Sequence, residues 1–333
     1  MLKQNKTLLV TGGAGFIGSE FVRQAVNNGL NIVVLDKISY SGDLERLSSV
    51  KHKIQFYKTD IAQKTALENV FKKVKPTAIV HFAAETHVDR SIHHSIDPFI
   101  QANVIGTQNL IELSRKYQIK RFIHISTDEV YGQSRSGKFK ENSPISPNNP
   151  YSATKASAEM LVKAAIHTFE FPAIIIRPAN NYGPWQYPEK FIPVIITKAL
   201  KGANIPVYGK GLQIREWLHV TDCASAIHFI LKKGTIGEAY NIGSYFEKPN
   251  IETAKTVLKL LGKNKDQIEF VKDRPGHDFR YSVDCEKLHK LGWKPKVTFK
   301  EGISQTVDWY MSHQDWLKKK IDFLEKYWKT VYR

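Results

Sequence analysis

A glycine-rich turn between a strand pattern and a helix pattern constrains the fold of this chain more than any other feature. Residues 11–18 are Thr-Gly-Gly-Ala-Gly-Phe-Ile-Gly, after the apolar run Thr7–Thr11 and at the start of the helical pattern Gly15–Gly29. Glycines let the backbone approach a diphosphate, and the free N–H groups of a helix N-terminus face its negative charge. A second apolar run, Ile32–Asp36, ends on an acid placed to accept ribose hydroxyls. Together these features predict a dinucleotide site.

Asp36 also indicates which dinucleotide is bound. A carboxylate in this place repels a 2′-phosphate, so the sequence favours NAD over NADP. The adjacent Lys37 acts in the opposite direction. The alternative interpretation, a glycine turn that only lets a helix pack closely, explains the glycines but not the acid.

Apolar runs and helical patterns alternate through the first half of the chain. Further strand patterns lie at Ile54–Lys58, Thr77–Ala83 and Arg121–Ser126, and a helical pattern covers Val104–Tyr117. The runs are nearly continuous in Val, Ile and Phe, as expected for strands covered on both faces. We therefore expect an α/β fold of Rossmann type, with a doubly wound parallel sheet between two helix layers.

After Tyr151 the pattern changes and predicts a smaller α/β substrate lobe. A helix at Ser152–Phe169 and a strand at Ala173–Ile176 precede a stretch with four prolines and shorter elements. The loop 132–150 is rich in Ser, Asn and Pro and is expected to border the site. We assign residues 1–178 to a dinucleotide lobe with a return segment at about 215–240, residues 179–214 and 241–315 to the substrate lobe, and residues 316–333 to a C-terminal helical tail.

The net charge of +17 comes from basic residues scattered along the chain. We attribute it first to a solvated surface, second to attraction of an anionic diphosphate substrate, and expect no nucleic-acid partner. No apolar run approaches the ~18 residues that span a membrane, and no secretory signal is evident. Cys223 and Cys285 lack metal-ligand spacing and fit a reducing, cytoplasmic setting. We expect no metal site, since His93 and His94 lack a third ligand.

A tyrosine and a lysine four positions apart form the candidate catalytic pair. Residues 151–155 are Tyr-Ser-Ala-Thr-Lys, and this spacing puts Tyr151 and Lys155 on one helix face. An ammonium beside a phenol stabilises phenolate, so we expect Lys155 to lower the pKa of Tyr151 and make it a base. Thr127, at the end of the preceding core strand, is placed to hold a substrate hydroxyl near Tyr151.

These motifs resemble the extended short-chain dehydrogenase/reductase family and, within it, the dTDP-glucose 4,6-dehydratases. The resemblance runs in order from about Lys6 to Met311. It rests on His81–Ser91, Ile125–Gly132, Asn180–Pro184, Pro188–Lys190 and Asp273–Asp278. It implies a NAD-dependent lyase that removes water from a nucleotide-diphosphate hexose and passes hydride from C4 to C6.

The resemblance also implies a role for each site residue. Tyr151, with Lys155 and Thr127, would deprotonate O4, Glu129 would take the C5 proton, and Asp128 would protonate the departing C6 hydroxyl. The cofactor-binding set is Gly12, Gly13, Gly15, Phe16, Ile17, Gly18, Asp36, Lys37, Ser39, Asp60, Ile61, Ala83, Ala84, Thr86, Tyr151, Lys155 and Asn181. The substrate-binding set is His87, Thr127, Asn180, Lys190, Phe191, Pro206, Tyr208, Arg215, Asn250, Arg274 and His277.

Several alternatives stay open at this stage. Phe191 stands where the family usually has leucine, and Pro178-Ala179 also depart from its pattern, so UDP-glucose or another nucleotide hexose competes with dTDP-glucose. Epimerases and decarboxylases share much of the chain, but epimerases lack the Asp128-Glu129 pair and decarboxylases usually have serine at the position of Asp128. A non-catalytic NAD-sensing protein would not need that pair.

The resemblance further implies a homodimer joined through Asn103–Tyr117 and Ser152–Phe169, which would then show apolar positions on two faces. The Trp-, Tyr- and Lys-rich tail from Gln314 to Arg333 lies beyond the resemblance. We expect an amphipathic helix packed on the body, with membrane-surface binding as the alternative.

Overall fold

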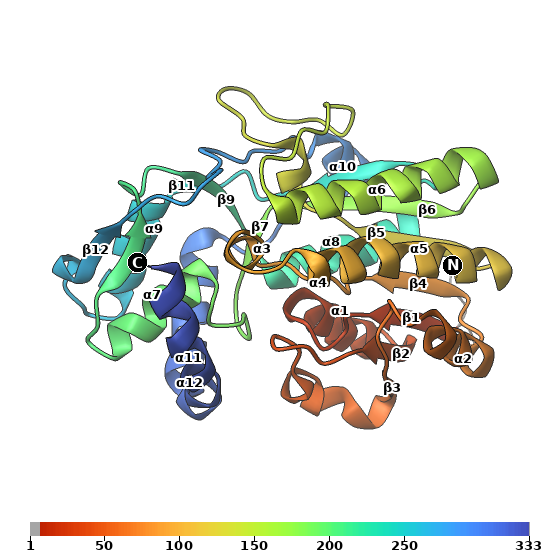
Figure 1. Ribbon diagram of the computed structural model, residues 1–333, viewed down its shortest axis with the longest axis horizontal. Helices are drawn as coiled ribbons and strands as arrows, with labels where there is room; N and C mark the ends of the chain where they lie inside the picture. Colours follow the sequence, from red (N-terminus) through yellow and green to blue (C-terminus); the bar gives the residue numbers. More distant parts are fainter. Residues whose placement is uncertain (1–6, 333) are drawn as a thin grey trace.

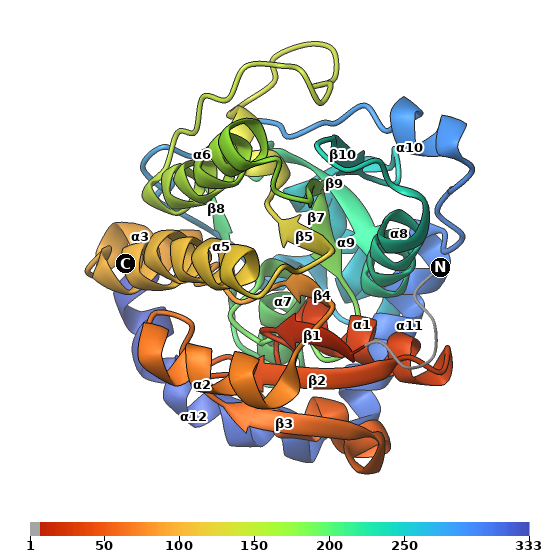
Figure 2. The same ribbon diagram turned by 90° about the vertical axis from the view of Figure 1, so that its right-hand side faces the viewer.

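The computed structural model describes residues 7–332 and contains a seven-stranded parallel sheet at its centre. The strand order is β10-β6-β5-β4-β1-β2-β3 (Figures 1 and 2). Its strands are β1 (Thr7–Thr11), β2 (Asn31–Asp36), β3 (Ile54–Lys58), β4 (Ala78–His81), β5 (Arg121–Ile125), β6 (Ala173–Pro178) and β10 (Ala239–Ile242). The predicted fold class is confirmed, because the order reverses beside β1 as in doubly wound folds.

Helices cover both faces of this sheet. On one face, α1 (Phe16–Asn27) and α8 (Val220–Lys233) pack on the side of β1 where Leu8 and Val10 are buried. On the other face, α2 (Lys64–Val74), α5 (Gly106–Lys116) and α6 (Pro150–Phe169) pack around Leu9. Alternate side chains of a strand point to opposite faces, so the almost unbroken apolar runs supply both cores.

The second lobe carries two small sheets and its own core. One sheet has the order β11-β9-β7, and the other pairs β12 with β8. Its strands are β7 (Asn180–Tyr182), β8 (Ile205–Tyr208), β9 (Ile214–His219), β11 (Glu247–Pro249) and β12 (Ile268–Val271). Its helices are α7 (Phe191–Leu200), α9 (Asn250–Leu260), α11 (Phe299–Ser312) and α12 (Gln314–Val331). The lobe lies to one side of the central sheet in Figure 1.

Short elements connect these layers. They are η1 (Leu44–Lys53), α3 (Val88–His93), α4 (Asp97–Phe99), η2 (Ile100–Ile105), η3 (Asp128–Tyr131), η4 (Lys265–Gln267) and α10 (Glu286–Leu291). None of the helices between residues 7 and 332 is long and apolar enough to cross a bilayer.

Three expectations about local structure need correction. The strand expected at Thr77–Ala83 ends at His81, where its pairing with β1 and β5 ends. The helix expected at Val104–Tyr117 begins at Gly106, because a π-helical segment, η2, precedes it. The return segment contains more than a crossing helix, since β9 joins the small sheet, α8 packs on α1, and β10 adds an edge strand to the central sheet.

Candidate active site

The glycine turn forms one end of a cavity at the carboxyl ends of the central strands. Gly15 is the N-cap of α1 and offers no side-chain cap to the first N–H groups. A Cβ on Gly15 would meet only Gly12 O, at 3.1 Å, and would otherwise project into open space. Helix N–H groups left without a side-chain cap bind phosphate oxygens well, so this end of the cavity fits a dinucleotide diphosphate.

The other glycines of the turn permit close packing. A Cβ on Gly18 would lie 2.3 Å from Gly12 O, so α1 can approach the turn only without a side chain there. Gly13 does not line the cavity, and a Cβ on it would lie 2.7 Å from Val34 Cγ1. Gly13 therefore packs the helix on the sheet rather than facing the cofactor.

Asp36 and Lys37 define the ribose end. Asp36 is buried at the end of β2, and its carboxylate accepts hydrogen bonds from Ala14 N at 3.0 Å and Ile38 N at 2.8 Å. Burial raises its pKa, whereas these two N–H groups oppose the rise. Lys37 Nζ lies 3.1 Å from Glu85 Oε1 and 3.9 Å from Asp60 Oδ2. Lys37 is the basic residue that weakened the prediction of NAD over NADP, and its ammonium is already paired with these two acids.

The remaining predicted cofactor residues lie along the same cavity. It is lined by Gly12, Gly15, Phe16, Ile17, Gly18, Asp36, Lys37, Ser39, Asp60, Ile61, Ala83, Ala84, Thr86, Tyr151, Lys155 and Asn181. These side chains come from six segments of the chain. Their convergence supports the predicted set and fits NAD in its extended form.

The five predicted catalytic residues line the continuation of this cavity. Thr127 follows β5 and caps η3, where its hydroxyl accepts from Glu129 N at 3.3 Å and lies 3.3 Å from Asp128 Oδ1. Tyr151 and Lys155 project from the first turns of α6, as their spacing predicted. A capping box between Asn149 and Ser152 fixes the start of that helix.

Asp128 and Glu129 occupy different environments. Asp128 is 3% exposed, and burial, followed by the charge of Glu129, raises its pKa well above the usual range. Glu129 is half-buried, and its Oε2 accepts from Asn149 Nδ2 at 3.3 Å and Tyr281 Oη at 3.4 Å. A pair of carboxyl groups can act as acid and base when one keeps its proton and the other is a carboxylate held by hydrogen-bond donors. Asp128 fits the first role and Glu129 the second.

The electrostatics of Tyr151 differ from the prediction. Burial, and next the charge of Glu129, raises the pKa of Tyr151 above its ordinary value. Burial lowers the pKa of Lys155 to about 8, against the opposing charge of Glu159. Lys155 Nζ donates one hydrogen bond to Ile125 O, at 2.6 Å. The charge of Lys155 is not among the causes that shift the pKa of Tyr151, so the expected lowering is not seen.

The predicted substrate residues divide into two groups. Thr127, Asn180 and Lys190 line the cavity, and Lys190 Nζ donates to Thr86 O at 3.0 Å. The others lie in the second lobe or at the N-cap of α3, and they do not line this cavity. They are His87, Phe191 at the start of α7, Pro206 and Tyr208 on β8, Arg215 on β9, Asn250 at the start of α9, and Arg274 and His277 in the loop after β12. Phe191 packs nearly parallel to Trp217, which places it, partly buried, against the core of the second lobe.

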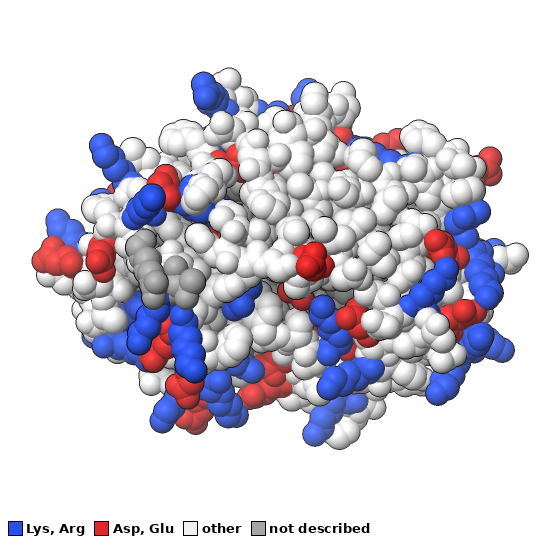
Figure 3. Space-filling view, in the orientation of Figure 1, with Lys and Arg blue, Asp and Glu red and all other residues white. Residues whose placement is uncertain are grey.

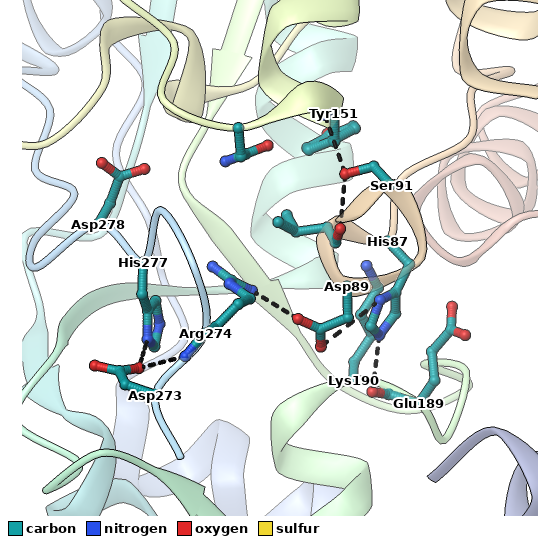
Figure 4. A network of polar contacts seen from close by, with 12 residues as sticks. His87, Asp89, Ser91, Tyr151, Glu189, Lys190, Asp273, Arg274, His277 and Asp278 are labelled. Atoms are coloured by element: carbon teal, nitrogen blue, oxygen red, sulfur yellow. Dashed lines mark hydrogen bonds and ion pairs between the residues drawn. The ribbon is translucent and has the colours of Figure 1, made fainter. Parts of the chain in front are cut away.

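Arg274 spans the cleft between the lobes. Its Nη1 lies 3.4 Å from Asp89 Oδ1, on α3 of the dinucleotide lobe, and Figure 4 shows the two side chains facing each other. Burial opposes the charged form, but Asp89 and further anions raise the pKa of Arg274 overall. Arg215 Nη2 donates to Asp278 O at 3.0 Å, beneath the Tyr281 ring. Contacts from other segments therefore fix both guanidinium groups, whose fork of donors is of the kind that binds phosphate oxygens.

Several of these side chains carry buried polar atoms that have no partner among the described residues. They are Asn180 Oδ1, Tyr208 Oη, Asn250 Oδ1 and Arg274 Nε. Buried polar atoms are normally hydrogen-bonded, so an orphaned set around one cleft marks a place where a polar ligand completes the bonding. The structure thus supports a substrate subsite that joins the cofactor cavity.

Three contributors were missed from the sequence. Arg46 is 1% exposed and donates to Ala14 O, Ser41 O and Trp185 O, which ties η1 to the cavity wall. Glu189 accepts from Arg90 Nε at 2.8 Å and from Tyr40 Oη at 2.8 Å. Tyr281 supports Glu129. The motif Pro188–Lys190 signalled Glu189, but a lone arginine in a polar stretch gave no signal for Arg46.

Comparisons with known proteins agree with this site. A family model described as GDP-mannose 4,6 dehydratase matches residues 9–306. The chain is 45% identical to a dTDP-glucose 4,6-dehydratase of Xanthomonas campestris, over 95% of this chain and 96% of that protein. A dTDP-glucose 4,6-dehydratase of Bacillus anthracis in complex with NAD has TM-score 0.88 and 45% identity, covering 95% of this chain and 99% of that one.

A dTDP-glucose 4,6-dehydratase of Streptomyces venezuelae, solved with NAD bound, has TM-score 0.90 and 41% identity, covering 93% of this chain and 98% of that one. The match therefore includes both lobes and the loops that carry the catalytic and substrate residues. By sequence and by structure, the chain belongs to the NAD-dependent nucleotide-sugar 4,6-dehydratases of the short-chain dehydrogenase/reductase family.

Proposed function

We propose that this protein converts dTDP-glucose to dTDP-4-keto-6-deoxyglucose with loss of one water. The observation that carries the proposal is the Asp128-Glu129 pair, which lines one cavity together with Tyr151 and the glycine turn. An epimerase needs the phenol and the dinucleotide but no such pair. The relatives named dTDP-glucose 4,6-dehydratases support the choice of substrate.

The chain's own groups account for the proton transfers. Tyr151 accepts the O4 proton as phenolate, a form that the positive charge of bound NAD would favour against the effect of burial, while the C4 hydrogen leaves as hydride. The resulting ketone acidifies C5. Glu129 removes the C5 proton, and Asp128, kept protonated by burial, gives its proton to the departing C6 hydroxyl, which leaves as water. Glu129 then returns a proton to C5 as hydride reduces C6. NAD supplies the hydride acceptor, a positive charge beside the site, and the hydride that reduces C6. Hydrogen bonds from Asn149 and Tyr281 position the Glu129 carboxylate to remove the C5 proton.

Mass measurement of the product tests the reaction. Incubation with dTDP-glucose should give a product lighter by one water, and parallel incubation with UDP-glucose tests the choice of base. Substrate deuterated at C4 should carry deuterium on the C6 methyl, whereas reaction in heavy water should label C5. A label returned to C4 would identify an epimerase instead, and a label found in water would reject the dehydratase assignment.

We also propose that the predicted residue roles and lobe boundaries hold. The dinucleotide lobe would comprise residues 1–178 with the return segment 215–240, the substrate lobe residues 179–214 and 241–315, and the tail residues 316–333. Support comes from the separate core around α7, α9 and α11. The free thiols of Cys223 and Cys285 support a reducing, cytoplasmic setting.

A homodimer joined through α5 and α6 completes the proposal. Ile105 is 40% exposed and Met160 42%, although the opposite faces of their helices are buried in the core. The surface over these helices is mainly uncharged in Figure 3, and the outer stripe of α6 continues through Ala153, Ser157 and Ala164. Apolar exposure on helices that are already packed indicates a second partner.

Light scattering tests the dimer. The wild type should have twice the mass of one chain, and Met160→Glu should shift it toward the monomer because a charge in an apolar interface is poorly solvated. Leu212→Glu, at a residue 54% exposed on the second lobe, serves as control. A monomeric wild type at micromolar concentration would contradict the proposal.

A further inference from the structure

The C-terminal helix α12 lies outside residues 9–306, which the family model covers, yet it packs against the substrate side of the cleft. One face of α12 is buried in the second lobe through Leu317, Leu324, Trp328 and Val331. Near its start, Trp316 Nε1 donates to Asp43 Oδ2 at 2.7 Å, in the dinucleotide lobe. Further along the helix, the Tyr327 ring lies 4.2 Å from Cζ of Arg90, on α3 of the dinucleotide lobe. The tail is therefore a fixed part of both lobes.

Tyr327 connects this helix to Arg274 through α3. Its hydroxyl lies 3.2 Å from His87 Nδ1, and His87 Nε2 lies 3.2 Å from Glu189 O. A carbonyl only accepts, so His87 carries its proton on Nε2, and Nδ1 accepts from the Tyr327 hydroxyl. Burial supports this neutral form by lowering the pKa of His87 to about 3.

The tautomer of His87 decides what Asp89 can bind. His87 Nδ1 is 4.0 Å from Asp89 Oδ2, so a proton on Nδ1 would let His87 compete for this carboxylate. With Nδ1 occupied as an acceptor, the Asp89 carboxylate is left to pair with Arg274 across the cleft. Figure 4 shows His87, Asp89 and Arg274 in this order. The Tyr327 hydroxyl thereby keeps the guanidinium in its place.

The last turn of the tail reaches a second substrate residue. The Tyr332 ring lies 5.6 Å from the ring of Tyr208, which in turn lies 5.8 Å from the ring of His277. Tyr208 Oη has no partner among the described residues, although it is buried. The Tyr332 ring therefore packs against Tyr208, the tyrosine that the resemblance places against the nucleotide.

We propose that α12 is part of the nucleotide-sugar site, with Tyr327 and Tyr332 as positioning residues for the diphosphate-binding Arg274 and for Tyr208. The inference deepens the proposed function and rests on it for the identity of the ligand. It assigns the tail a role in substrate affinity rather than in the chemical steps. Among the described residues, Tyr327 and Tyr332 form no hydrogen bond with the glycine turn or with the Asp128-Glu129 pair.

Two pairs of variants test the inference in the full-length protein with NAD bound. Tyr327→Phe removes one hydroxyl and keeps the ring, and Tyr117→Phe removes a hydroxyl that bonds Glu68 far from the cavity. Tyr332→Ala removes the ring that backs Tyr208, and Tyr332→Phe restores it. The readouts are the affinity for dTDP by calorimetry, KM and kcat for dTDP-glucose, and NAD content.

We expect Tyr327→Phe to weaken dTDP binding and raise KM about fivefold, and Tyr332→Ala to do so about tenfold. Tyr117→Phe and Tyr332→Phe should match the wild type, and kcat and NAD content should stay within about twofold in all four variants. Unchanged dTDP affinity, or a loss of kcat with unchanged KM, would overturn the inference. So would a wild type that does not bind dTDP. A wild type that binds dTDP but releases no water from dTDP-glucose would instead reject the proposed function, while the calorimetry would still decide the role of α12.

Discussion

The cofactor side of the cleft, here called the dinucleotide wall, and its substrate side, the substrate wall, differ in how their polar groups are hydrogen-bonded. On the dinucleotide wall, Asp36 accepts two backbone N–H groups and Lys155 donates to a backbone carbonyl, although Arg46 Nη2 and Asn181 Oδ1 lack partners among the described residues. On the substrate wall, Asn180, Asn250 and Tyr208 keep buried polar atoms without partners among the described residues. The first wall is built on strand ends of one sheet, whereas the second gathers short strands, loops and helix starts around a separate core.

This difference indicates that the cofactor side is pre-organised and that the substrate side is completed by its ligand. Pre-organised groups lower the cost of binding and hold reacting atoms in place. Orphaned groups raise specificity, because a ligand that fails to bond them leaves them buried and unpaired. The following predictions would break this comparison or sharpen it, from the largest effect to the smallest.

Tyr151→Phe should have the largest effect. The variant lacks the oxygen that accepts the O4 proton, so oxidation at C4 should slow by about 10³-fold, within the range for a lost acid–base group. Single-turnover absorbance of NADH measures this step directly. NAD content should remain that of the wild type, since the dinucleotide wall is intact; loss of the cofactor would show that the variant damages binding instead.

Asp128→Asn and Glu129→Gln should slow elimination by about 10²-fold while NADH still forms. Oxidation needs the phenol but neither carboxyl directly, so the reduced cofactor should accumulate before water is lost. The same absorbance trace, combined with mass analysis of the product, separates the two steps. If both variants are as slow as Tyr151→Phe in forming NADH, the assignment of roles is wrong.

Asp36→Ala and Asn180→Ala should separate the two walls. The first removes the acceptor for the ribose hydroxyls and should lower NAD retention about tenfold, leaving dTDP affinity unchanged. The second should raise KM for the substrate by a similar factor of about ten, leaving NAD content unchanged. Released NAD after denaturation and calorimetry with dTDP measure these effects. Variants that lose both ligands together would show that the walls are coupled.

His87 should contribute a small, pH-dependent effect on stability. Its pKa is lowered by burial to about 3, so between about pH 6.5 and pH 3 the unfolded chain binds a proton that the folded chain does not. Stability therefore rises with pH across this window, and His87 costs at most about 2 kcal/mol at pH 5 relative to pH 7. Urea unfolding of the wild type and His87→Gln at both pH values tests this. Equal pH dependence of both proteins would contradict it.

Sequence patterns predicted the parts of the molecule that depend on neighbours along the chain. The glycine turn, the acid at the end of β2 and the spacing of Tyr151 and Lys155 each specify a local geometry, and the cavity contains all of them. Apolar runs predicted β1 and β3 with their observed ends. The tail was expected as a packed helix, and α12 confirms this.

Tertiary structure decided what depends on through-space proximity. Arg274 and Asp89 lie 185 positions apart, and nothing along the chain specifies that they pair. The pKa of Asp128 and that of Tyr151 are both raised first by burial and next by the charge of Glu129. Burial depends on how the whole chain packs, which is why the expected effect of Lys155 was wrong. Desolvation and Coulomb interactions depend on the arrangement of groups in space. The sequence by itself therefore determined which groups the site has. Packing determined their charge, their hydrogen-bond partners and the position of α12 beside them.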